Sequence, residues 1–218
     1  QEWHWQGKGL SLAQPDSYFG AATPPPGQED APVYKPITFI AIDPLNPGAR
    51  YVAEKDNGLW QWQPANQSWQ RLGQGNPDLP DAAGTALPIA AYGGQLLYAG
   101  NDVNLYASSD RGATWTLVAL PGKQPKNGIE SVLFDTHGRP FVAGHDGIWR
   151  GEGRYPWSWS RIVDVGVDRI AFMGNDRLVV SGQIQNNAAS AVRCYTLEGA
   201  PVSDWSSVPM TSWLLSRL

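Results

Sequence analysis

The sequence predicts an all-β protein built from repeated four-stranded sheets. Its 218 residues include 24 Gly, 18 Pro and 11 Trp, which is typical of turn-rich β proteins and unfavourable for helices. Strand-like apolar runs recur four times in the same order between residues 37 and 208. The last run of each repeat carries a tryptophan, and these lie 46, 44 and 46 residues apart at Trp69, Trp115, Trp159 and Trp205.

Each repeat contains four expected strands, of which the first carries small and apolar side chains. The first repeat has Ile37–Ile42, Arg50–Ala53, Gly58–Trp62 and Ser68–Leu72. The second has Leu87–Tyr92, Gln95–Ala99, Asn104–Ala107 and Thr114–Val118. The third has Ile129–Phe134, Pro140–Ala143, Gly147–Arg150 and Ser158–Ile162. The fourth has Asp168–Phe172, Arg177–Ser181, Val192–Tyr195 and Asp204–Val208.

The corner between the second and third strands also repeats. It carries Asn57-Gly58 in the first repeat and Asp146-Gly147 in the third, pairs that tight hairpins prefer. A four-stranded unit of about 40 to 50 residues is the blade of a β-propeller, in which neighbouring blades cover each other's faces. We therefore predict one β-propeller domain over 37–208, with four clear antiparallel blades. Their expected bounds are 37–72, 87–118, 129–162 and 168–208.

The two terminal segments are together one repeat long. Residues 1–36 are expected to form an N-terminal arm with a Pro-rich connector at Pro24–Pro26, because Pro does not fit a central strand. Trp3–Gly7 is similar to the last strand of a blade, and residues 209–218 suit a C-terminal closing strand or a tail. These lengths favour a fifth blade shared between the termini. Four blades with tails, or an open arc of a larger ring, are the alternatives.

One hairpin, within Leu105–Val118, carries the most complete turn signal. Ser108, Asp110, Gly112 and Trp115 meet the pattern S-x-D-x-G-x-x-W, and the hairpin resembles the Asp-box of the sialidase and BNR-repeat families. That resemblance implies a β-propeller fold. It also implies a structural hairpin whose Ser and Asp bond the backbone of their own turn, as short polar side chains often do.

Two enzyme families come close to the sequence, and we predict neither activity. In a sialidase three arginines hold a carboxylate, whereas Lys35–Ile37 stands where the Arg-Ile-Pro signature is expected. Ile42–Pro47 and Tyr51–Trp60 resemble the opening blade of the family 74 xyloglucanases, which implies a catalytic carboxylate at Asp56. Those enzymes take a second acid from a second propeller, because an inverting glycosidase needs two carboxylates. We expect Asp56 to be a turn residue and predict no catalytic residue.

Charge and composition limit the partners of the chain. The net charge of −4 supplies no basic field for nucleic acid. The single Cys194 is expected to be a core thiol, and His4, His137 and His145 are too dispersed for a metal site, so we predict no metal or cofactor. No apolar run approaches the ~20 residues of a membrane span. The start at Gln1 suits an exported product, which favours an extracellular or periplasmic location.

Aromatic side chains are the main candidates for binding. Those near the third and fourth strands are expected to stack on a sugar or anchor a protein, unless they pack between blades; they are Trp60, Trp62, Trp149, Tyr155 and Trp157. The leading prediction is a non-catalytic propeller that binds a protein partner or itself as an assembly subunit, similar to BNR and photosystem II assembly-factor-like propellers. The alternatives are a carbohydrate-binding propeller lectin and, third, a glycoside hydrolase.

Overall fold

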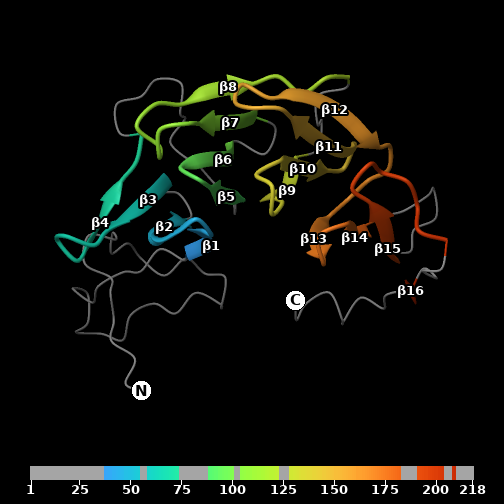
Figure 1. The fold of residues 1–218 in the computed structure, drawn as a ribbon, viewed down its shortest axis with the longest axis horizontal. Coiled ribbons are helices and arrows are strands. Elements are labelled where there is room, and N and C mark those ends of the chain that lie inside the picture. The colour runs from blue at the N-terminus through green and yellow to red at the C-terminus, as the bar shows by residue number, and fades with distance from the viewer. Residues whose placement is uncertain are drawn as a thin grey trace, which may run out of the picture.

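The structure is a computed structural model, and it describes residues 37–54, 58–73, 88–100, 104–122, 128–182, 191–203 and 208–209. Over these ranges the chain forms sixteen strands in four antiparallel four-stranded sheets, and no helix (Figure 1). The all-β prediction is therefore confirmed. In every sheet the strands follow one another in chain order, so each sheet is a simple meander.

The strands of the four sheets have the following bounds. The first sheet contains β1 Ile37–Asp43, β2 Asn46–Glu54, β3 Gly58–Gln63 and β4 Ser68–Arg71. The second contains β5 Ile89–Tyr92, β6 Gln95–Gly100, β7 Asn104–Ser108 and β8 Thr116–Val118. The third contains β9 Ile129–Phe134, β10 Pro140–Gly144, β11 Gly147–Glu152 and β12 Ser158–Val163. The fourth contains β13 Arg169–Met173, β14 Arg177–Gly182, β15 Ala191–Thr196 and β16 Val208–Pro209.

The four sheets stand side by side along an arc (Figure 1). Their first strands line the inside of this arc, with β1 beside β5, β5 beside β9 and β9 beside β13. Strands β4, β8 and β12 lie on its outside. The first and fourth sheets lie at the two ends of the arc, so each has a described neighbour on one face only.

Three hydrophobic clusters fill the spaces between consecutive sheets. The first joins the first and second sheets, the second joins the second and third, and the third joins the third and fourth. Strands of the middle sheets serve two clusters at once: in β6, Leu96 belongs to the first and Leu97 to the second. This follows from the pleat, which sends successive side chains to opposite faces. The middle sheets are therefore apolar on both faces.

A polar link between the first and second sheets accompanies the first cluster. Asp43 ends β1 and is 1% exposed. Its two carboxylate oxygens accept hydrogen bonds from the backbone N–H groups of Gly93 and Gly94, each at 2.8 Å, in the β5–β6 turn. The carboxylate also accepts from Leu45 N at 3.0 Å and so closes its own turn. Backbone N–H groups of the second sheet thus satisfy the hydrogen-bonding capacity of a carboxylate that is buried in the first sheet.

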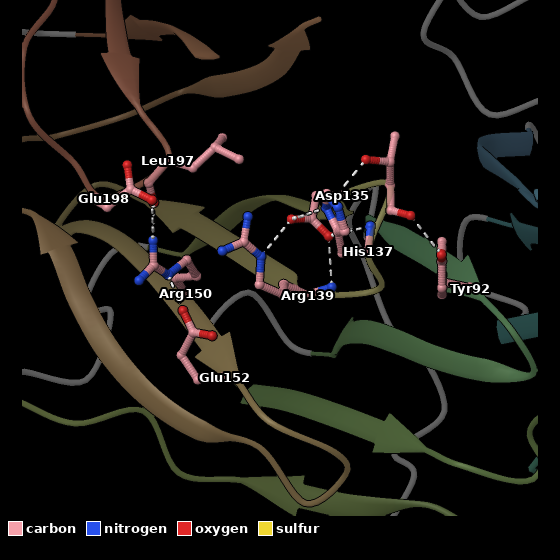
Figure 2. Close-up of polar contacts among 9 residues, drawn as sticks. Tyr92, Asp135, His137, Arg139, Arg150, Glu152, Leu197 and Glu198 are labelled. Carbon is pink, nitrogen blue, oxygen red and sulfur yellow. Dashed lines mark hydrogen bonds and ion pairs between the residues drawn. The ribbon is translucent and has the colours of Figure 1, made fainter. Parts of the chain in front are cut away.

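The other two pairs of sheets have links of different chemistry (Figure 2). The Tyr92 hydroxyl donates to the carbonyl of Thr136 at 2.8 Å, which joins the second sheet to the β9–β10 turn. That turn is held by Asp135, which accepts from Arg139 N at 2.8 Å and Arg139 Nε at 2.7 Å. From the third sheet, Arg150 Nη1 donates to the Leu197 carbonyl of the fourth at 2.5 Å.

Most strand bounds lie within two residues of the expected ones, but β2 begins at Asn46 rather than Arg50, and two outer strands also differ. β8 begins at Thr116 rather than Thr114, because Thr114 N is already bonded to the Asp110 carboxylate and belongs to the turn. The strand expected over Asp204–Val208 is described only at its end, where β16 pairs Val208 with Val192. Most of the expected fifth blade, residues 1–36 and 210–218, lies outside the described residues.

Removal of the Asp43 carboxylate is expected to weaken the junction between the first two sheets. Asp43→Ala leaves two inward-facing N–H groups without their acceptor, and we expect a loss of about 2–4 kcal/mol in the free energy of unfolding. Asp43→Asn keeps one acceptor oxygen and should lose less. Urea denaturation measures both, with exposed Asp176→Ala as a control expected to stay within about 0.5 kcal/mol of the parent chain. An Asp43→Ala chain as stable as this control would contradict the assigned role.

Candidate functional site

The predicted Asp-box residues form a closed hydrogen-bonded hairpin between β7 and β8. Ser108 Oγ accepts from the backbone N–H of Gly112 at 2.8 Å and donates to Asp110 Oδ1 at 2.8 Å. Asp110 in turn accepts from Thr114 N at 2.8 Å and Thr114 Oγ1 at 2.6 Å. The Trp115 indole donates to the Gly112 carbonyl at 3.0 Å. These polar groups are therefore engaged within the turn rather than directed at a ligand.

This hairpin also contacts the first sheet. Gly112 has φ +87°, and a Cβ there would lie 2.8 Å from Leu72 Cδ1, so the turn sits directly on the residue that follows β4. Arg111 N donates to the Gly94 carbonyl at 2.9 Å, while Gly94 N donates to Asp43. The hairpin thus belongs to the junction of the first and second sheets.

A partial copy of the hairpin follows β15 in the fourth sheet. Thr196 Oγ1 accepts from the N–H groups of residues two and four positions later, Glu198 and Ala200, as Ser108 Oγ does with Asp110 and Gly112. Gly199 has φ +88°, and a Cβ there would lie 2.1 Å from the Ile162 carbonyl of the third sheet. Sequence reasoning missed this copy because Thr replaces Ser, no Asp follows, and the Gly lies three residues after the hydroxyl instead of four.

For three of the five predicted aromatics, burial favours the alternative of packing between sheets over a role as stacking platforms. Trp149 is 0% exposed and donates its indole N–H to the Pro121 carbonyl at 3.0 Å. Trp157 is buried in the second cluster, with Tyr155 edge-on to it at 5.2 Å. The Tyr155 hydroxyl also contacts Thr116 Oγ1 on β8. These three rings therefore pack between the second and third sheets, because a neighbouring sheet covers them.

The first sheet gives its aromatics a different setting. Trp62 is buried, and Trp69 packs edge-on against it with ring centroids 5.5 Å apart. Trp60 is partly buried and pairs across the strands with Arg71. An open pocket of about 560 Å³ lies here; its lining residues are Trp60, Gln63, Asn66, Ser68, Trp69, Gln70 and Arg71. We call it the β3–β4 pocket, and of the predicted aromatics only Trp60 lines it.

The chemistry of the β3–β4 pocket is polar and aromatic. Two indoles, three carboxamides, a hydroxyl and a guanidinium line it, and no carboxylate does. The side chains of Asn66, Ser68 and Gln70 make no hydrogen bond with the described residues, so their donors and acceptors are available to a polar ligand or to water. Sequence reasoning named none of these polar residues, because single Asn, Ser and Gln residues in a hairpin carry no distinctive pattern.

Ionisable groups meet between the third and fourth sheets. Arg169 Nη1 lies 3.0 Å from Glu130 Oε2, and His145 Nε2 lies 3.3 Å from Glu130 Oε1. His145 Nδ1 is 3.9 Å from Asp168. Within the described ranges, no group of three or more His, Cys, Asp and Glu has the arrangement of a metal site. The part of the chain that the structure covers also has no helix long and apolar enough to cross a membrane.

Solved structures share this arrangement of sheets. A GH74 xyloglucanase from Xanthomonas campestris aligns with a TM-score of 0.55 at 18% identity, covering 79% of this chain and 31% of the enzyme. The extracellular domain of a hybrid two component system, BT3049 from B. thetaiotaomicron, has a TM-score of 0.54 at 14% identity, over 75% of this chain and 22% of that one. YCF48 bound to D1 peptide has a TM-score of 0.54 at 10% identity, over 82% and 54%.

The fold is a β-propeller. This confirms the propeller prediction, and at these identities the likeness concerns the fold alone. The chain spans between about a quarter and about half of the length of the structures it matches. No family model matches the sequence, and no curated protein matches it. The residue that the GH74 resemblance marks as catalytic, Asp56, lies outside the described residues.

Acid should weaken the β7–β8 hairpin through Asp110. Partial burial raises the pKa of Asp110, but hydrogen bonds from Thr114 and Ser108 outweigh it, so this pKa lies below its ordinary value. A lowered folded-state pKa stabilises the fold above the unfolded-state pKa of about 3.9, and this stabilisation is lost as the pH falls through the folded-state value.

We therefore expect Asp110→Asn to show a smaller drop in unfolding free energy between neutral pH and about pH 3 than the parent chain. Urea denaturation at the two pH values measures this difference. The exposed carboxylate variant Asp176→Asn should keep the drop of the parent chain. Equal drops in the parent and Asp110→Asn chains would contradict a lowered pKa at Asp110.

Proposed function

We propose that the chain is a non-catalytic β-propeller of the Asp-box type that binds protein and serves as an assembly subunit. The observation that carries this proposal is the face of the first sheet turned away from the second, which we call the outer face. Ile40 and Ile42 on β1 lie on it and are 66% and 54% exposed. In the middle sheets, by contrast, residues of both faces belong to hydrophobic clusters.

The outer face continues across the sheet as a row of apolar side chains. Ile40 pairs with Val52, Val52 with Trp60, and directly paired residues share one face of an antiparallel sheet. None of these residues belongs to a hydrophobic cluster with another sheet. Of this row Ile40 is exposed, Trp60 is half-buried and Val52 is 2% exposed, so the accessible apolar part of the outer face is its β1 edge, where Ile40 and Ile42 lie two residues apart. Two neighbouring exposed Ile side chains at this edge favour a contact with another protein.

The structural neighbours are compatible with this proposal. YCF48 is bound to a D1 peptide, so one protein of this fold binds a polypeptide. A GH74 enzyme of the same fold is a xyloglucanase, and we propose no such activity here; three of the described carboxylates, Asp43, Asp110 and Asp135, hold turns. The extracellular domain among the neighbours supports a location outside the cytoplasm. Recovery of the chain in the cytosolic fraction of its own cells would overturn that location.

Charge on the outer face is expected to abolish association. Light scattering should give the full chain a mass above 23.7 kDa, and the Ile40→Lys/Ile42→Lys double variant a mass of 23.7 kDa. Loss of two buried Ile side chains, about 3 kcal/mol, weakens the association constant about a hundredfold. Leu117→Lys is the matched control, since Leu117 is equally apolar and 62% exposed on β8. A double variant that associates like this control would contradict the proposal.

The β3–β4 pocket favours a carbohydrate as a second candidate ligand. Sugar hydroxyls both donate and accept hydrogen bonds, as carboxamides do, and an indole face packs on the C–H face of a sugar ring. Calorimetric titration with cellotetraose and maltotetraose should show binding that Gln70→Ala or Trp69→Ala weakens about tenfold. Leu117→Ala should leave binding unchanged, and a parent chain that binds neither sugar would remove this candidate.

A further inference from the structure

The outer face of the first sheet repeats a face that is already an interface elsewhere in the molecule. In the third sheet, Trp149 of β11 pairs across the strands with Arg161 of β12, and the guanidinium lies 5.5 Å from the indole centroid. In the first sheet, Trp60 of β3 pairs with Arg71 of β4 in the same way. Both tryptophans stand two residues after the Gly that begins the third strand. The two faces are therefore equivalent in the repeat.

The third sheet shows what such a face contacts. Trp149 is fully buried in the cluster formed with the second sheet, to which Ala90, Leu97 and Ala107 contribute. These three residues are paired across β5, β6 and β7, so they form one row in which the aliphatic Leu97 lies between two small Ala side chains. A Trp-bearing face therefore packs on a row of this composition, where the small residues leave room for the indole.

The fourth sheet carries a matching row on the face at the other end of the arc. Ala171, Val179 and Cys194 are paired across β13, β14 and β15, again small, aliphatic and small. They alternate with Ile170, Leu178 and Tyr195, which belong to the cluster with the third sheet. The row therefore faces away from the third sheet, and Ala171 is exposed. Figure 1 shows the first and fourth sheets at opposite ends of the arc.

We propose that the outer face of the first sheet binds the outward row of the fourth sheet in a second copy of this chain, head to tail. This inference rests on the proposed function and names its partner. The proposed contact repeats the way in which consecutive sheets pack within one chain, where β1 lies beside β5 and β9 lies beside β13. In this contact, Ile40 on β1 of one copy lies beside Ala171 on β13 of the other copy. Such a heterologous contact yields a closed ring if the rotation closes and a filament if it does not.

Two single variants test the contact from its two sides. Ala171→Glu places a carboxylate on the row, and Ile40→Lys an ammonium on the outer face, so each full-length variant alone should lose association. An equimolar mixture should recover it, because the introduced ammonium of one copy then meets the introduced carboxylate of the next, while the other contact of a two-copy ring stays native. Light scattering measures the masses, and Leu117→Lys should associate like the parent chain.

The outcomes separate this inference from the proposed function. Association that survives Ala171→Glu but not Ile40→Lys would overturn the head-to-tail contact and leave the outer face as a binding surface. A parent chain with a mass of 23.7 kDa at every concentration would overturn self-association. If that monomer associates once residues 1–36 are deleted, the chain's own N-terminal segment is the occupant, and the proposed second copy is wrong. Unfolding curves that match the parent chain confirm that the variants are folded.

Discussion

The structure depends on the covering of sheet faces by neighbouring sheets. A four-stranded sheet with apolar side chains on both faces has no stable solvated state, because each face loses the free energy of burial unless another layer covers it. The second and third sheets satisfy this constraint through two clusters each, and Leu96 and Leu97 show how adjacent residues of one strand serve different neighbours. Within the described residues, the first and fourth sheets have a neighbouring sheet on one face only, and the proposed contact surfaces lie on their other faces.

Polar side chains then fix the order in which covered sheets meet. Gly94 illustrates this, since its N–H binds Asp43 of the first sheet while its carbonyl accepts from Arg111 of the β7–β8 hairpin. The hairpin and the inner strand of the preceding sheet are thus held by one residue. Apolar contacts alone allow one sheet to shift along its neighbour, whereas each of these hydrogen bonds requires one geometry and so specifies one arrangement of the two sheets.

The sequence predicted the repeat, the strand order and the fold, because periodic apolar runs and turn residues are local signals. It did not distinguish Trp60 from Trp149, which occupy the same position in their repeats. Trp60 lines an open pocket and Trp149 is fully buried, because the described part of the chain places a sheet before the third sheet and none before the first. Whether a neighbouring sheet covers a tryptophan depends on how the sheets pack, and the residue and its repeat position do not reveal it. The links made by Asp43 and Tyr92 were missed for a similar reason, since their partners are backbone groups of another repeat.

The three polar links have one further consequence, for the evolution of the repeat. A carboxylate meets two amides at the first junction, a phenol meets a carbonyl at the second, and a guanidinium meets a carbonyl at the third. Each junction therefore contains a link between a different pair of chemical groups. A duplicated or transposed repeat would meet a neighbour without the matching group, which at the first junction would leave the buried Asp43 carboxylate without its donors. Although the repeats share one strand order, they are therefore not interchangeable, and gain or loss of a repeat is expected at the ends of the array.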